Sequence, residues 1–167
     1  MISPIFRKLK TTFAAIPSIL FAFRSNESEE SPVLEAKVLQ QANQEIELGK
    51  IYRLINWNTQ FAGSREHHFF YDGGPDVEVK SVILNKTLRS ISKQLSEADI
   101  SVLQEVDRDS DRTGRIDQLE EYRFSQPNLS TAFTPYHYCA YLPTPSHRPL
   151  ARVDMHLVTL SKFVIST

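Results

Sequence analysis

Two short apolar stretches decide the fold of this chain, LINWN at residues 54–58 and SVLQEVD at residues 101–107. Each is rich in aliphatic or aromatic residues and ends in polar side chains. Such runs, bounded by polar residues, are typical of β-strands. We therefore expect strands over residues 51–57 and 100–106, with functional side chains where they end.

A helix is predicted between these strands, over residues 77–97. Its apolar residues recur at intervals of four, three and four, at Leu84, Leu88, Ile91 and Leu95. Asp76 precedes them as a plausible N-cap. Strand, helix and strand in this order form a crossover unit of an α/β domain, which brings Asn58 and Glu105 near one edge of the sheet. The almost continuous apolar second strand predicts a central position, buried on both faces.

A long loop is predicted over residues 59–75. It holds three of the five glycines, two adjacent histidines and three consecutive aromatic residues. Loops of this length inside a domain are usually functional or disordered, and the aromatic residues argue for order. His67 and His68 are therefore candidates for lining a substrate cleft. A purely structural role in the loop is the alternative.

Composition indicates one globular domain. The chain has 167 residues, of which 41% are apolar and 23% charged. The net charge of −1 gives no overall positive field, so a nucleic-acid substrate would need a local basic patch. The single cysteine, Cys139, allows no intrachain disulfide. That usage fits a reducing compartment and slightly favours the cytoplasm over a membrane-associated or exported location.

The N-terminal region divides into three segments before the domain at residues 50–167. Residues 1–24 form a basic and apolar leader, whose apolar stretch, residues 11–23, is too short to span a bilayer. It is either signal-peptide-like, an amphipathic helix that associates with a membrane, or a loosely docked leader. Residues 25–32 form an acidic linker. Residues 33–49, rich in Ala, Gln, Glu and Leu and with Gly49 as a natural stop, predict a helix.

Glu105 is the strongest candidate for a site residue. A carboxylate at the end of a core strand is costly unless it is neutralised, paired with a cation or bound to a metal. Magnesium commonly takes one or two carboxylates together with water and phosphate oxygens. The Asn58 amide can hold a phosphate oxygen or orient a metal-bound water. The simpler alternative is that Glu105 forms a surface ion pair with Arg112 or Arg115.

The motifs also carry a family resemblance. Asn56-Trp57-Asn58 after one strand and Gln104-Glu105-Val106 in the next resemble the "WN" and "QEV" strands of the endonuclease/exonuclease/phosphatase superfamily, also called DNase I-like. Four further stretches are similar to segments of its members: residues 60–63, 68–74, 107–112 and 158–163. The resemblance runs from about Ile51 to Ile165 and concerns the N-terminal portion of the family domain.

The resemblance implies an α/β (α+β) fold, the N-terminal half of a four-layered sandwich with mixed β-sheets. It also implies a metal-dependent phosphoesterase that hydrolyses phosphodiester or phosphomonoester bonds, with nucleic acid as one class of substrate. Glu105 matches the glutamate that binds Mg²⁺, for which Mn²⁺ is an alternative. Asn58 matches the asparagine that holds the phosphate and the attacking water.

Two departures limit what the resemblance implies. His156 stands where members usually have a glycine, which predicts strain near the site. The later "N-T-H", "G-D-F-N" and "D-H" motifs, which complete the site in members, do not occur in these 167 residues. We therefore expect negligible turnover by the chain alone. The alternative function is an inactive product of a truncated or split gene, which needs a partner chain to complete the sandwich.

Overall fold

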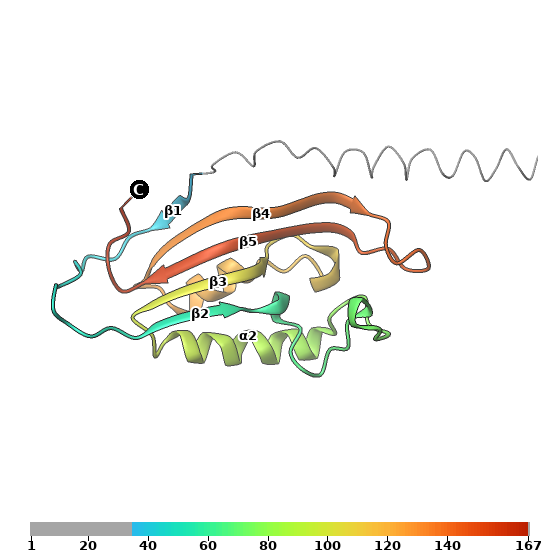
Figure 1. The fold of residues 1–167 in the computed structure, drawn as a ribbon, viewed down its shortest axis with the longest axis horizontal. Helices are drawn as coiled ribbons and strands as arrows, with labels where there is room; N and C mark the ends of the chain where they lie inside the picture. The colour runs from blue at the N-terminus through green and yellow to red at the C-terminus, as the bar shows by residue number, and fades with distance from the viewer. Residues whose placement is uncertain (1–34, 167) are drawn as a thin grey trace, which may run out of the picture. The chain divides into compact units, whose positions relative to one another are not determined.

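The computed structural model describes residues 35–166, which form one mixed five-stranded sheet and two α-helices (Figure 1). The sheet order is β1-β4-β5-β3-β2. The strands are β1 (Lys37–Gln40), β2 (Leu54–Asn58), β3 (Ile100–Asp107), β4 (Ser130–Leu142) and β5 (Ala151–Ser161). The helices are α2 (Ser81–Leu95) and α3 (Gln118–Ser125), and three short 3-10 turns are η1 (Gln60–Ala62), η2 (Phe70–Asp72) and η3 (Asp111–Thr113). The predicted leader, 1–24, and linker, 25–32, lie outside the described residues.

The predicted crossover unit is confirmed. β2 and β3 pair in parallel, from Leu54 opposite Ile100 to Asn58 opposite Gln104, and α2 connects them. The pairs β3–β5, β4–β5 and β1–β4 are antiparallel. The predicted mixed α/β class is therefore confirmed. The parallel pairing ends β2 and β3 at the same edge, because both strands run in one direction.

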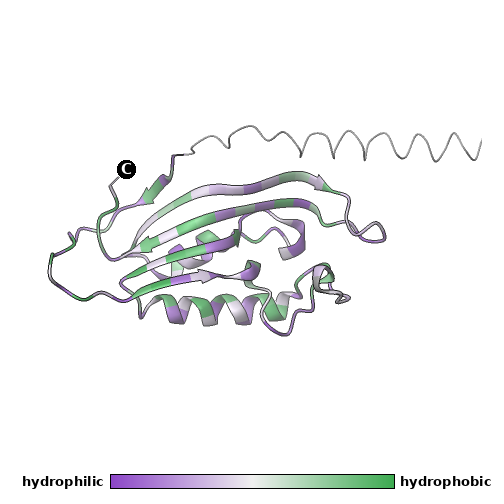
Figure 2. Cartoon of the chain, in the orientation of Figure 1, coloured by the Kyte–Doolittle hydropathy of each residue, from purple (hydrophilic) through white to green (hydrophobic). Residues whose placement is uncertain are grey.

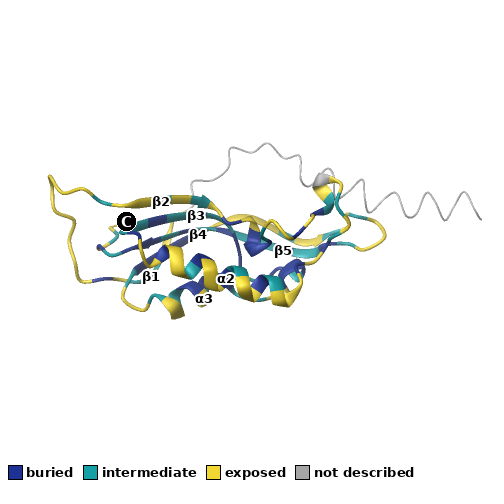
Figure 3. Ribbon diagram, turned by 90° about the horizontal axis from the view of Figure 1, so that it is seen from below, coloured by how far each residue is buried: buried dark blue, intermediate teal, exposed yellow. Residues whose placement is uncertain are grey.

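Both helices cover the same face of the sheet (Figure 3). The apolar stripe predicted for α2 is buried in the core with residues of α3 and of the strands. The main contributors are Leu84, Leu88, Ile91 and Leu95 of α2, Leu119 and Tyr122 of α3, and Leu103, Val158 and Leu160 of the sheet. Burial of this stripe is what holds the helix on the sheet.

No helix in the described part of the chain covers the opposite face, and this corrects the expectation that β3 is buried on both faces. Along β3, buried Ser101 and Leu103 alternate with half-buried Ile100 and Val102. In β2, Leu54 on the same face as Val102 is 60% exposed. Figure 2 shows that β2 and β3 are mostly hydrophobic where they begin and more hydrophilic where they end. The sequence is apolar on both faces, but helices pack on only one.

The helix predicted over residues 33–49 is wrong for the described residues. Lys37–Gln40 instead form β1, which pairs with Thr131–Phe133 of β4. The backbone N–H of Ala42 then donates to the Ser130 hydroxyl at 2.8 Å. An open edge of β4 would leave backbone hydrogen-bonding groups without partners. Pairing of these groups outweighs the local helix propensity of Ala, Gln and Glu.

The start of α2 also differs from the prediction. Asp76 is not the N-cap, because its carboxylate accepts a hydrogen bond from the His68 backbone N–H at 3.0 Å. The N-cap is Lys80, whose side chain makes no capping hydrogen bond. Val77 and Val79 precede the helix and are buried in the core. The residues described include no helix long and apolar enough to cross a membrane.

Candidate functional site

Asn58 and Glu105 are in direct contact where β2 and β3 end. The Asn58 Nδ2 donates to Glu105 Oε1 at 2.8 Å, and the Asn58 Oδ1 accepts from the Gln60 backbone N–H at 2.9 Å. The amide orientation is therefore fixed at both of its atoms. The crossover unit therefore brings Asn58 and Glu105 together, as the sequence predicts.

A local distortion of β3 aims the Glu105 side chain. The register of β3 against β5 shifts between Leu103 and Val106, and Glu105 has a φ of 56°. The Thr59 hydroxyl lies 3.0 Å from the Gln104 carbonyl and 3.2 Å from that of Glu105. A bulge of this kind redirects a side chain at the end of a strand, and a left-handed glutamate stores backbone strain.

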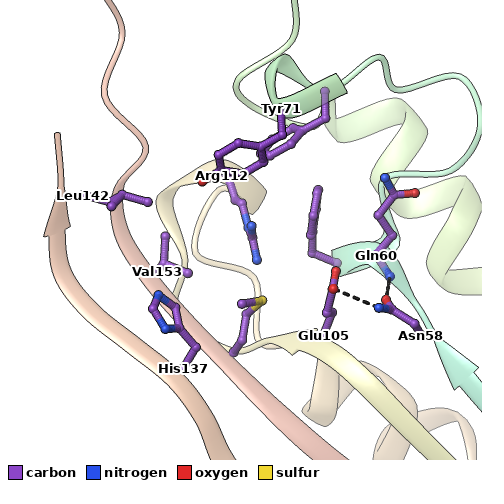
Figure 4. A pocket seen from close by; sticks show the side chains of 11 residues that line it. Asn58, Gln60, Tyr71, Glu105, Arg112, His137, Leu142 and Val153 are labelled. Carbon is purple, nitrogen blue, oxygen red and sulfur yellow. Dashed lines mark hydrogen bonds between the residues drawn. The ribbon is translucent and has the colours of Figure 1, made fainter. Parts of the chain in front are cut away.

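A cavity of about 480 Å³ opens beside this pair (Figure 4). It is bounded by the 60–75 loop, the η3 segment and the outer ends of β4 and β5. Its lining is Asn58, Gln60, Phe61, Phe69, Tyr71, Glu105, Arg112, His137, Leu142, Val153 and Met155. Polar and charged groups line this hollow together with aromatic and aliphatic side chains, so it offers both hydrogen-bonding and apolar contacts to a small molecule.

The simple ion-pair alternative for Glu105 is not found. Arg112 donates through Nε and Nη2 to the two carboxylate oxygens of Asp107, at 2.9 and 2.8 Å. Arg115 instead contacts Asp109 at 3.3 Å and Asp111 at 2.6 Å. Among the residues described, Glu105 therefore has an amide partner and no cationic one.

The Arg112–Asp107 pair is enclosed next to the cavity. The two side chains are 4% and 0% exposed, and the Thr113 hydroxyl lies 3.2 Å from the Asp107 carboxylate. The Arg112 guanidinium lies over the Phe61 ring, 3.9 Å from its centroid. Hydrogen bonds and stacking together fix the plane of this guanidinium.

His67 and His68 are not brought to this cavity. They lie against a separate hollow of about 330 Å³ with Gly73, Gly74 and Pro75. His67 is buried between Phe61 and Phe69, while His68 is exposed. Burial lowers the pKa of His67, only partly opposed by the charge of Asp76. The pair that the structure gathers is therefore Asn58 with Glu105, without the two histidines.

His156 does not show the backbone strain expected from a histidine in the family's glycine position. It lies within β5, opposite Val106, with ordinary negative φ. Its side chain is buried, and its Nδ1 has no hydrogen-bond partner in the described part of the chain. Burial lowers its pKa, and the charge of Asp154 opposes that shift. Positive φ near the site is found instead at Glu105 and in η1, where Gln60 and Phe61 have φ of 47° and 42°.

The donor set suits a weakly held, hard cation. Within residues 35–166 no three His, Cys, Asp or Glu side chains cluster closely enough to hold a metal ion. Glu105 offers a carboxylate and Asn58 an amide oxygen. Such a set could hold Mg²⁺ only together with water, phosphate oxygens or further ligands.

Comparison of the chain with family models, with curated proteins and with solved structures finds no match. The site must therefore be judged from its own geometry. Sequence reasoning missed Tyr71, His137 and Met155 as cavity residues. The long aromatic loop was a signal for Tyr71, whereas His137 and Met155 depend on the register of β4 against β5, which opposes them.

Proposed function

We propose that this chain carries the Glu105 and Asn58 half of a magnesium-dependent phosphoesterase of the DNase I-like superfamily. The observation that carries the proposal is the 2.8 Å contact between Asn58 and Glu105 at the edge of a cavity of about 480 Å³. Their sequence motifs, strand ends and parallel pairing agree with the resemblance. In this proposal the sheet is one of the two sheets of a four-layered sandwich.

In the proposed site, Glu105 holds the cation, with Mg²⁺ preferred and Mn²⁺ as a substitute. A bound cation polarises the phosphoryl oxygen and offsets the charge that develops in hydrolysis. Asn58 keeps the Glu105 carboxylate in place through Nδ2 and presents its amide next to the phosphate. The positive φ of Glu105 points its side chain out of the ladder, because an extended residue would continue the strand.

The proposed substrate is a phosphate ester. The cavity lining includes an arginine, two side-chain amides and several aromatic rings. It can bind a phosphoryl group together with an adjoining apolar group or nucleobase. Nucleic acid is one member of this class. The near-neutral chain offers no broad positive surface, so contact with a long polyanion would be confined to the cavity region.

A second candidate is a half-domain without turnover of its own, completed by another segment or chain. The helix-free face supports it, because Leu54 is 60% exposed there and Val102 half-buried. Such a face is normally covered by a second layer. Under this candidate, Glu105 and Asn58 become catalytic only when the second sheet supplies the remaining groups.

Calorimetric titration with Mg²⁺ and Mn²⁺ tests the proposal. The wild-type chain is expected to bind one cation, and Glu105→Gln is expected to abolish that binding, because the amide keeps the shape and removes the charge. Glu97→Gln is the matched control, since Glu97 is an exposed carboxylate after α2 that contacts Arg53. Equal cation binding by wild type and Glu105→Gln would refute the metal role of Glu105. Hydrolysis of a phosphodiester by the chain alone would exclude the second candidate.

A further inference from the structure

Arg112 is the one guanidinium in the lining of the Asn58–Glu105 cavity, as far as the described residues go. Only 4% of its side chain is exposed, so its position is set by its neighbours. One edge, Nε and Nη2, is held by both oxygens of Asp107. One face is held by the Phe61 ring at 3.9 Å.

The remaining nitrogen, Nη1, is left for another partner. It donates to no acceptor within the residues described, whereas the other two nitrogens are both engaged. Figure 4 shows the guanidinium end of Arg112 reaching into the cavity on the side of Glu105. An arginine that already has one acceptor pair still has N–H groups for a second anion.

A further side chain, Gln118, holds both residues that contact the Arg112 guanidinium. The Gln118 side chain donates to the Phe61 carbonyl at 2.8 Å and accepts from the Asp107 backbone N–H at 3.2 Å. Gln118 thereby connects Phe61, which stacks on the Arg112 guanidinium, with Asp107, which pairs with it. This fixed plane is the arrangement that favours a charge-assisted hydrogen bond to a phosphoryl oxygen.

From this geometry we infer that Arg112 is a phosphate-binding residue, which donates from Nη1 to an oxygen of a phosphoryl group in the Glu105 cavity. The inference deepens the proposed function and rests on it for the class of substrate. Asp107, Thr113 and Gln118 are positioning residues, because they act through Arg112 or Phe61. Because Arg112 neutralises the charge of Asp107, this carboxylate does not repel the phosphate. The contacts with Asp107 and Phe61 fix the direction of the guanidinium that meets the phosphate.

The test uses the full chain, inorganic phosphate as the probe, and NMR titration without divalent cations. The double variant Asp107→Leu/Arg112→Met replaces the ion pair by an apolar pair, since removing one partner alone would leave a buried charge and destabilise the fold. Arg108→Met is the matched control. Arg108 is also held by an aspartate, Asp117, at 2.7 Å, and lies outside the cavity lining.

Phosphate is expected to shift the resonances of the cavity residues in wild type and in Arg108→Met. Its affinity for the double variant is expected to be lower by a factor of about ten or more. The Arg112 Nε–Hε signal of the wild type should move as well, a readout that needs no variant. Unchanged affinity in the double variant, or no response of the wild type, would overturn the role of Arg112. Mg²⁺ titration of the same samples reports on Glu105 separately, because the double variant retains Glu105 and Asn58.

Discussion

Glu105 combines a role in the candidate site with an unfavourable backbone conformation. Its φ of 56° lies in the left-handed region, which costs a residue with a side chain about 1 kcal/mol or more. The motif predicted that this glutamate would end a strand beside Asn58. It could not predict the bulge, because the bulge follows from the register of β3 against β5 and from the Thr59 hydroxyl.

Replacement of Glu105 by glycine and by alanine should separate the strain from the chemistry. Both variants lose the carboxylate, and only glycine adopts positive φ without steric cost. We expect Glu105→Gly to have a free energy of unfolding about 1 kcal/mol higher than Glu105→Ala. Urea denaturation of the two variants measures the difference. Equal stabilities would mean that residue 105 is not left-handed in solution.

The two buried histidines predict a loss of stability in mild acid. Burial lowers the pKa of both His67 and His156 below the 6.5 that is ordinary for a histidine in the unfolded chain. Below pH 6.5 the unfolded chain therefore binds more protons than the folded one, so the free energy of unfolding falls as the pH falls through the folded pKa values. Urea denaturation across this pH range is expected to show the fall. His156→Leu should reduce its slope, and an unchanged slope would exclude His156 as a contributor.

At the scale of elements, the predictions that succeeded are those with a strong periodic pattern. α2 was predicted from its apolar stripe, and β2 and β3 from their uniform runs. β1 was missed because the composition of residues 33–49 favours a helix, while the open edge of β4 favours a strand. Only the assembled sheet reveals that edge. The start of α2 was placed too early because buried Val77 and Val79 continue the apolar pattern outside the helix.

The N-terminus of α2 offers a stabilising substitution. The N-cap Lys80 makes no side-chain hydrogen bond, and the first turn contains no acidic residue. Lys80→Asp supplies an acceptor for the free N–H groups and a negative charge near the positive end of the helix dipole. We expect the free energy of unfolding to rise by about 1 kcal/mol. Lys93→Asp, in the last turn, is the control and should destabilise. A fall in stability for Lys80→Asp would contradict the observed cap position.

At the scale of the molecule, the sequence predicts that the helix-free face is apolar but not what covers it. The apolar pattern of β3 predicts two covered faces, and the helices of the described residues cover one. A sequence pattern records that a surface is apolar. It does not say which partner buries it, so the four-layered sandwich remains a proposal.

This face predicts self-association that depends on concentration. Leu54, 60% exposed, lies on the helix-free face, whereas Phe124, 89% exposed, belongs to α3 on the other side. Leu54→Glu is expected to reduce association by placing a charge on the apolar sheet face. Phe124→Glu, the matched control, should leave association unchanged. Sedimentation velocity over a range of concentrations measures both. A chain that is monomeric throughout, or an effect confined to Phe124→Glu, would show that the sheet face does not drive association.

The central claim, a cation site at Glu105 and Asn58, is tested most directly by mapping Mn²⁺ on the protein by NMR. Mn²⁺ broadens signals of nuclei close to it, so the backbone amides that disappear first locate the ion. We predict that broadening centres on Asn58, Thr59 and Glu105, and that Glu105→Gln abolishes it. Broadening centred on the acidic segment at Asp109 and Asp111, or spread evenly over the surface, would contradict the account.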